Sequence, residues 1–135
     1  MANLNEALHT LRREYVAEAN ENLGHIDRLI SKMQTEPSGP TLEHLYRRFL
    51  GLAGSGDTYG FPEVSRLGRQ GEKLCGALLR TGRFASPSVL LACRAVLRSL
   101  QAEFDRLRPL YVIGPWVQGD TRRSRASFLR WGATP

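Results

Sequence analysis

The side chains of this chain that could do chemistry are three histidines and two cysteines. His9, His25 and His44 could take up a proton, a metal ion or a phosphoryl group, but none has a carboxylate or a second imidazole at catalytic or metal-ligand spacing. Cys75 and Cys93 have neither the spacing of a zinc site nor the number of a secreted disulfide framework. We therefore interpret the histidines as surface or boundary residues, and the cysteines as small core residues in a reducing compartment. The sequence predicts no enzyme, no metal and no cofactor.

A second candidate for function is one face of a helix predicted over residues 41–59. Its apolar positions recur at steps of three and four, which predicts that they face a core. These core positions are Leu42, Leu45, Phe49, Leu52, Gly56 and Tyr59, and the opposite face carries Glu43, Arg47, Leu50, Gly54 and Asp57. Leu50 is therefore expected to be exposed. A glycine inside a helix costs about 1 kcal/mol relative to alanine, so Gly51, Gly54 and Gly56 indicate either the close approach of a partner or close packing between helices.

Four amphipathic helices would position this face, and glycine and proline clusters separate them. They are predicted over residues 3–34, 41–59 and 62–80, and from residue 87 to a stop at Pro109. Gly24 is expected to bend the first helix, Gly82 to cap the third and Pro87 to begin the fourth. The short connections predict an all-α fold, an antiparallel up-and-down four-helix bundle. We expect the bundle to occupy residues 1–108, and a partly disordered extension to follow over residues 109–135.

The helix around Leu50 resembles the active helix of a histidine phosphotransfer (Hpt) domain, in which a histidine takes and gives a phosphoryl group. The family pattern is approximately H-x-L-[KA]-G-[SA]-x-x-x-x-G followed by an apolar residue. Six positions match it in order: Leu52, Ala53, Gly54, Ser55, Gly60 and Phe61. The resemblance covers about residues 1–108 and implies the same four-helix bundle. It puts Leu50 at the position of the phospho-accepting histidine, and leucine has no nitrogen to phosphorylate.

The resemblance implies a non-phosphorylatable Hpt-like binding module of two-component phosphorelay signalling. His44 cannot replace the missing histidine, because it precedes Leu50 by six residues, which is about 240° around a helix. The partner would be the receiver domain of a response regulator or a histidine kinase. In the family, the glycine four residues after the acceptor clears the surface for the receiver, and Gly54 holds that position here. The expected partner-binding residues are Arg47, Leu50, Gly51, Gly54, Asp57 and Thr58.

Two other functions stay open at the level of sequence. The first is helical self-association, in which the face around Leu50 or the segment around Trp116 would form a homodimer. The second is binding of nucleic acid or of an acidic partner by a basic, aromatic tail. The tail residues concerned are Arg122, Arg123, Arg125, Phe128 and Trp131. Half of the net charge of +6 lies after residue 118, so the rest of the chain has an ordinary surface charge, and a solvated tail is favoured over a nucleic-acid contact.

The sequence also bears on compartment. No stretch reaches the roughly 20 apolar residues of a membrane-spanning helix. The first residues show no basic region followed by an apolar run. Together these features predict a cytoplasmic protein without membrane contact.

Overall fold

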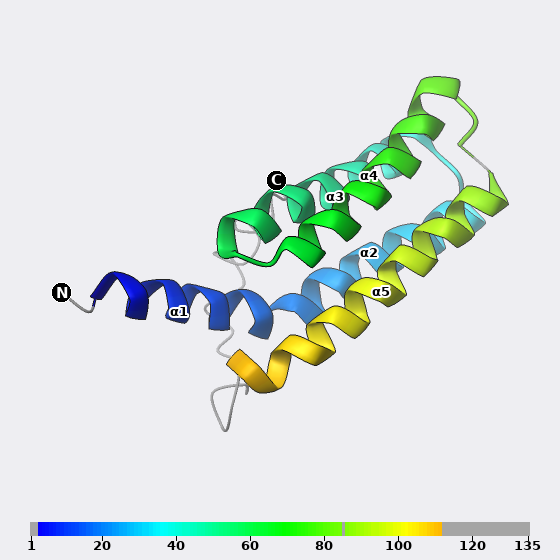
Figure 1. Cartoon of the computed structure of the whole chain (residues 1–135). Coiled ribbons are helices and arrows are strands. Elements are labelled where there is room, and N and C mark those ends of the chain that lie inside the picture. Colours follow the sequence, from blue (N-terminus) through cyan, green and yellow to red (C-terminus); the bar gives the residue numbers. More distant parts are fainter. Residues whose placement is uncertain (1–2, 85, 112–135) are drawn as a thin grey trace.

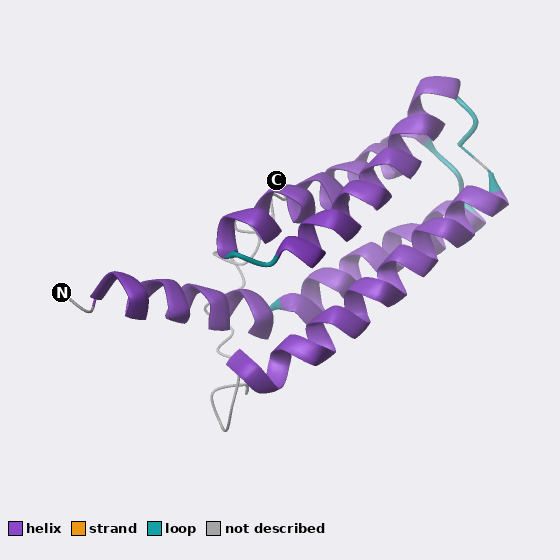
Figure 2. Ribbon diagram, viewed as in Figure 1, coloured by secondary structure: helices purple, strands orange, loops and turns teal. Residues whose placement is uncertain are grey.

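A computed structural model gives the structure of the chain, and it describes residues 3–84 and 86–111 (Figure 1). The described residues form five helices and no strand (Figure 2). The helices are α1 (Asn3–Ala17), α2 (Ala19–Thr35), α3 (Gly39–Tyr59), α4 (Pro62–Thr81) and α5 (Pro87–Tyr111). The last four lie side by side, each packing mainly against two of the others, and α1 extends past the end of this group. The predicted all-α fold class is confirmed.

The first predicted helix is two helices, and its expected bend at Gly24 is wrong. The chain changes direction at Glu18, which separates α1 from α2. Two backbone hydrogen bonds span this point, from Glu18 N to Glu14 O at 3.0 Å and from Asn22 N to Glu18 O at 3.3 Å. Gly24 lies inside α2, where an added Cβ would make only an ordinary contact with Arg28. A single glycine does not by itself break a helix, and α2 continues through Gly24 without interruption.

Most helix ends lie at the predicted glycines and prolines, and the exceptions are the start of α3 and the end of α5. Gly60 and Gly82 adopt left-handed backbone conformations, with φ of 83° and 69°, and cap α3 and α4 as such residues commonly do. Helix α3 begins at Gly39 rather than at residue 41, because the Ser38 side chain accepts a hydrogen bond from Thr41 N at 3.2 Å. The proline at the second helical position, Pro40, is compatible with a first turn.

The predicted stop at Pro109 is wrong, since α5 continues to Tyr111 with this proline inside its last turn. A proline so close to a helix end removes only one backbone hydrogen bond, which the few remaining residues tolerate. The predicted domain boundary after residue 108 therefore falls inside α5. Most of the predicted extension, residues 112–135, lies outside the described residues, and so does the tail considered for nucleic-acid binding.

Helices α3 and α4 approach each other closely because glycines face the contact. A Cβ added at Gly56 of α3 would lie 2.6 Å from Ser65 N, and one added at Gly68 of α4 would lie 2.6 Å from Ala53 N. A Cβ at Gly71 would overlap the ring of Phe49. Side chains at these positions would force the two helices apart. The contact is completed by a hydrogen bond of 2.6 Å from Ser65 Oγ to the carbonyl of Ala53.

The core lies between the four packed helices and is built from the predicted apolar stripes. Phe49, Phe104 and Leu97 are among its fully or almost fully buried side chains, whereas Tyr59, which was also predicted to be a core residue, is only half-buried. Over residues 3–84 and 86–111, no helix has both the length and the apolar character needed to cross a membrane.

Candidate functional site

The predicted docking residues lie on one outward surface of α3. Leu50 is 44% exposed, which confirms the prediction that it is not a core residue. Arg47, Gly54, Asp57 and Thr58 are exposed as well, and Gly51 is half-buried. We call this surface, made of Arg47, Leu50, Gly51, Gly54, Asp57 and Thr58, the Leu50 face. Helical periodicity was sufficient to find it, because all six residues come from a single helix.

The glycines of α3 serve two different purposes. Gly56 is buried against α4, as described above, so close packing accounts for it. Gly54 is exposed, and within the described chain a Cβ built on it would meet nothing within 4 Å beyond the local backbone of α3 and the adjoining residues. No contact between the described helices therefore requires a glycine at position 54. The carbonyl of Gly54 accepts a hydrogen bond from Thr58 Oγ1 at 3.0 Å, which holds the Thr58 side chain against its own helix.

The charged side chains of the Leu50 face are already engaged in ion pairs. Arg47 Nη2 lies 2.8 Å from Glu43 Oε1 on the preceding turn. Asp57 Oδ2 lies 3.1 Å from Arg69 Nη1 of α4. Both pairs are about half exposed, so they contribute little to stability. Their effect is to neutralise the two ends of the face and to leave Leu50 and Gly54 between them.

The histidines do not form a reactive centre with Leu50. His9 and His44 are exposed and His25 is half-buried, in agreement with their interpretation as surface and boundary residues. Partial burial lowers the pKa of His25 and of His44, and the positive charge of Arg48 lowers both further. Within the part of the chain that the structure describes, no three His, Cys, Asp or Glu side chains come together in a way that could hold a metal ion.

The two cysteines meet in the core, which their spacing in the sequence did not reveal. Cys75 of α4 and Cys93 of α5 are fully buried free thiols with their sulfur atoms 3.9 Å apart. The hydrogen bond to Cys93, together with burial, raises the pKa of the Cys75 thiol. A thiol with a raised pKa carries little thiolate and is a poor nucleophile. The pair is therefore part of the packing between α4 and α5.

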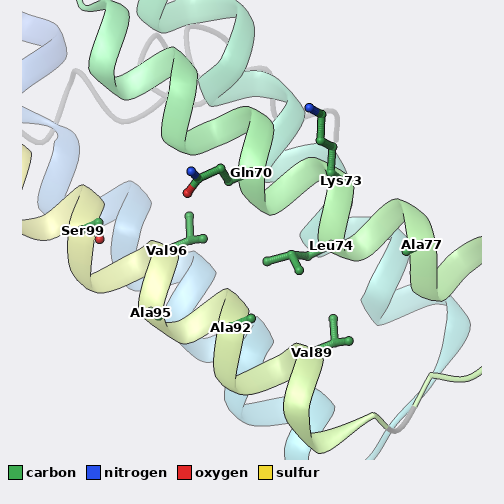
Figure 3. Close-up of a pocket in the computed structure, with 9 residues that line it drawn as sticks. All are labelled: Gln70, Lys73, Leu74, Ala77, Val89, Ala92, Ala95, Val96 and Ser99. Carbon is green, nitrogen blue, oxygen red and sulfur yellow. The ribbon is translucent and has the colours of Figure 1, made fainter.

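A pocket between α4 and α5 was also missed by the sequence (Figure 3). It has a volume of about 540 Å³, and Leu74, Val89 and Val96 give it an apolar lining. Small residues such as Ala77 and Ala92 leave room between the two helices. None of its lining residues comes from α3, so it is separate from the Leu50 face. The signal in the sequence was Ala77 on α4 with Ala92 and Ala95 on α5, but alanines also occur where helices pack closely, so they do not by themselves predict a pocket.

The Leu50 face combines apolar surface and open space with a carboxylate, Asp57, that pairs with Arg69 and a hydroxyl, Thr58, that donates to its own helix. Its one apolar side chain stands beside a glycine, and its charged groups are paired along or across the helices. The chain matches no protein-family model, no curated protein and no solved structure.

Proposed function

We propose that this protein is a non-phosphorylatable Hpt-like binding module of two-component phosphorelay signalling. In this proposal α2–α5 form an antiparallel up-and-down bundle, and the Leu50 face docks the receiver domain of a response regulator or a histidine kinase. The observation that supports it most is Gly54, which is exposed in the interior of α3 with open space around it. The resemblance of six residues to the Hpt pattern supports a receiver domain or a histidine kinase as the class of partner.

Gly54 lowers the stability of the free protein, and Leu50 can contribute binding free energy when a partner buries it. Glycine in place of alanine at an exposed helix interior costs about 1 kcal/mol of stability. Packing within the described chain gives nothing in return, because beyond the local backbone of α3 and the adjoining residues no atom lies within 4 Å of the missing Cβ. A partner that approaches over Gly54 would bury Leu50, and burying one apolar side chain at an interface is worth on the order of 1–2 kcal/mol. A binding surface therefore accounts for both residues.

Replacing Leu50 with glutamate should prevent docking while leaving the fold intact. The exposed site tolerates a charge in the free protein, but a bound partner would bury an unpaired carboxylate at the centre of the interface. We expect the affinity for the cognate receiver or kinase, measured by titration calorimetry, to fall at least about tenfold. The matched control is Leu91→Glu, since Leu91 is an exposed leucine of α5 outside the Leu50 face. This control should bind like wild type.

Two results would count against docking through the Leu50 face. The first is equal affinity of wild type and Leu50→Glu for the same partner. The second is a solution mass that doubles with concentration for wild type and stays monomeric for Leu50→Glu, with no binding to any receiver or kinase. That second result would favour the alternative in which the Leu50 face forms a homodimer.

A phosphorylated receiver should transfer no acid-labile phosphate to the wild-type chain. Leu50 offers no nitrogen, and His44 lies on another side of α3. In the variant Leu50→His, the open space over Gly54 would admit the phosphoryl donor, and Arg47 one turn earlier could contact the phosphoryl oxygens. We expect label on this variant alone, detected by phosphate that is lost in acid. Label on His9, His25 or His44 of the wild type would place the active site elsewhere.

The proposal also implies a cytoplasmic protein, because its partners would be the cytoplasmic parts of a signalling relay. It requires neither a cofactor nor contact with a membrane. Cell fractionation followed by immunoblotting would test the compartment directly.

A further inference from the structure

The pocket between α4 and α5 has apolar walls that the described residues leave partly exposed (Figure 3). We call this pocket of about 540 Å³ the α4–α5 groove. The side chains of Leu74, Val89 and Val96 point into it from the two helices. Leu74 and Val89 are only half-buried, and Ala92 is too small to fill the space between them. The groove therefore offers a surface on which another segment can bury apolar side chains.

Helix α5 ends close to one end of the α4–α5 groove. Its last residue, Tyr111, contacts Phe61 edge to face, with 5.4 Å between the ring centroids. Phe61 immediately precedes α4, so the chain leaves the described residues beside the start of α4. Gln70 is the first groove residue of α4, eight residues after the start of that helix, or about 12 Å. Ser99 is the last groove residue of α5, 12 residues before its end, or about 18 Å.

The residues that follow α5 have a composition that suits this groove. They lie outside the described residues, and positions 112–117 include no charged side chain. This segment consists of Val112, Ile113, Gly114, Pro115, Trp116 and Val117. Five residues span at most about 16–18 Å, so Trp116 can reach the end of the groove that is nearest to Tyr111. The apolar segment is therefore long enough to enter the apolar groove.

Charge complementarity supports the same pairing. Lys73 is an exposed residue of the groove wall, and no carboxylate of the described residues forms an ion pair with it. The first acidic residue after α5 is Asp120, four residues beyond Trp116. Four residues span up to about 14 Å, so Asp120 can reach Lys73 while Trp116 occupies the groove. An ion pair at this exposed edge would orient the segment more than it would add affinity.

We propose that the α4–α5 groove binds residues 112–117 of its own chain, with Trp116 as the anchor and Asp120 beside Lys73. A tryptophan contributes a large apolar area, about 150–250 Å². Because the segment and the groove belong to one chain, their effective concentration exceeds that of a separate partner. A second copy of the chain would bind without this advantage. The inference depends on neither the Leu50 face nor an Hpt identity.

Tryptophan fluorescence of the full chain tests this docking without a label. The chain has two tryptophans, Trp116 and Trp131, so the variant Trp131→Phe keeps Trp116 as the single reporter. In this variant we expect Trp116 to emit at a shorter wavelength than N-acetyltryptophanamide and to be quenched less by acrylamide. Both values should be the same at low and at high protein concentration, since the contact lies within one chain.

Blocking the groove should expose Trp116 to solvent. In the Trp131→Phe background, Ala92→Glu places a carboxylate in the groove, and burying this unpaired charge under the indole is unfavourable. The emission should shift to longer wavelength, and quenching should rise toward that of N-acetyltryptophanamide. The matched control is Ala102→Glu, at an exposed position of α5 outside the groove, which should behave like its parent. Circular dichroism verifies that the variants are folded, and Ala95→Glu, at an exposed position of the groove wall, replaces Ala92→Glu if that variant unfolds.

Three results would overturn this assignment. The first is a Trp116 that emits and is quenched like N-acetyltryptophanamide in the Trp131→Phe parent. The second is an equal effect of the groove substitution and of Ala102→Glu, which would mean that Trp116 is buried elsewhere. The third is protection of Trp116 that appears only at high protein concentration, which would show that the segment binds the groove of a second copy.

Discussion

Replacing Gly68 with alanine is expected to lower the free energy of unfolding by about 2–3 kcal/mol, the upper part of the range for overpacking a well-packed contact. The added Cβ would lie 2.6 Å from Ala53 N and 3.0 Å from the backbone carbon of Leu52. Both neighbours are backbone atoms of α3, so no side-chain rotation can relieve the overlap. Helix α4 would have to move away from α3 along their whole contact. Urea denaturation followed by far-ultraviolet circular dichroism measures the loss.

The matched substitution is Gly54→Ala, which adds the same methyl group to the other helix of the pair. Because the described chain places nothing within 4 Å of the new Cβ beyond the local backbone of α3 and the adjoining residues, only the helix propensity changes. We expect the free energy of unfolding to rise by about 0.5–1 kcal/mol. If both substitutions had the same sign, the assignment of Gly68 to packing and Gly54 to an open surface would be wrong.

Replacing Tyr15 with alanine is expected to cost about 3–5 kcal/mol of stability, as for other large aromatic residues in cores. Tyr15 is fully buried at the end of α1. Its ring stacks on Tyr59 at 4.8 Å and on Phe61 at 5.8 Å, measured between ring centroids, and contacts Phe104 of α5 at 5.9 Å. Thermal and urea unfolding of the variant would measure the loss. A cost below about 1 kcal/mol would show that α1 does not anchor the end of the bundle.

The variant Tyr15→Phe keeps the ring and removes the hydroxyl that lies 2.7 Å from Ser55 Oγ. It should cost about 1–2 kcal/mol near pH 7, because a buried hydrogen bond is lost. Burial raises the pKa of Tyr15 well above its ordinary value of 10.0. Stability is therefore fully present below about pH 10 and is lost as the pH rises toward the folded pKa, since the unfolded tyrosine ionises first.

The pH dependence of stability distinguishes the contribution of the Tyr15 hydroxyl from that of its ring. Wild type should lose stability above about pH 10 more steeply than Tyr15→Phe, which has no proton to release at this position. Denaturation midpoints measured between neutral pH and pH 11 would show the two curves converging. Parallel curves would mean that Tyr15 ionises equally easily in the folded and unfolded states.

Local sequence signals predicted most of the helix boundaries but not the break at Glu18. Gly60, Gly82 and Pro87 mark ends of helices because their backbone preferences act within a few residues. Glutamate is a good helix former, so the residue type at position 18 does not predict a break between two helices. There, Tyr15 of the preceding turn packs on aromatic residues more than 40 positions away in the sequence. Contacts of that range cannot be read from periodicity.

The features of the candidate site also separate into those that the sequence could predict and those that it could not. The Leu50 face could be predicted, because the exposure of residues on one helix follows from the spacing of its apolar positions. The burial of Arg48, the contact between Cys75 and Cys93 and the pocket beside Val96 could not. Each of these depends on how far two helices are rotated and separated relative to each other. Those quantities are set by the complete packing of the core, including the glycines of α3 and α4.

The close contact between α3 and α4 also has a consequence for recognition. Gly56 and Gly68 let the backbones of the two helices approach closely, and Gly71 makes room for the ring of Phe49, so movement of one helix against the other would disturb these contacts. The exposed surface of α3 is consequently held in one geometry before any ligand arrives. A rigid, preorganised surface loses little conformational entropy on association, so a larger share of the contact energy is retained as affinity. In the docking that we propose, this would help a small interface centred on Leu50 to be strong enough to be selective.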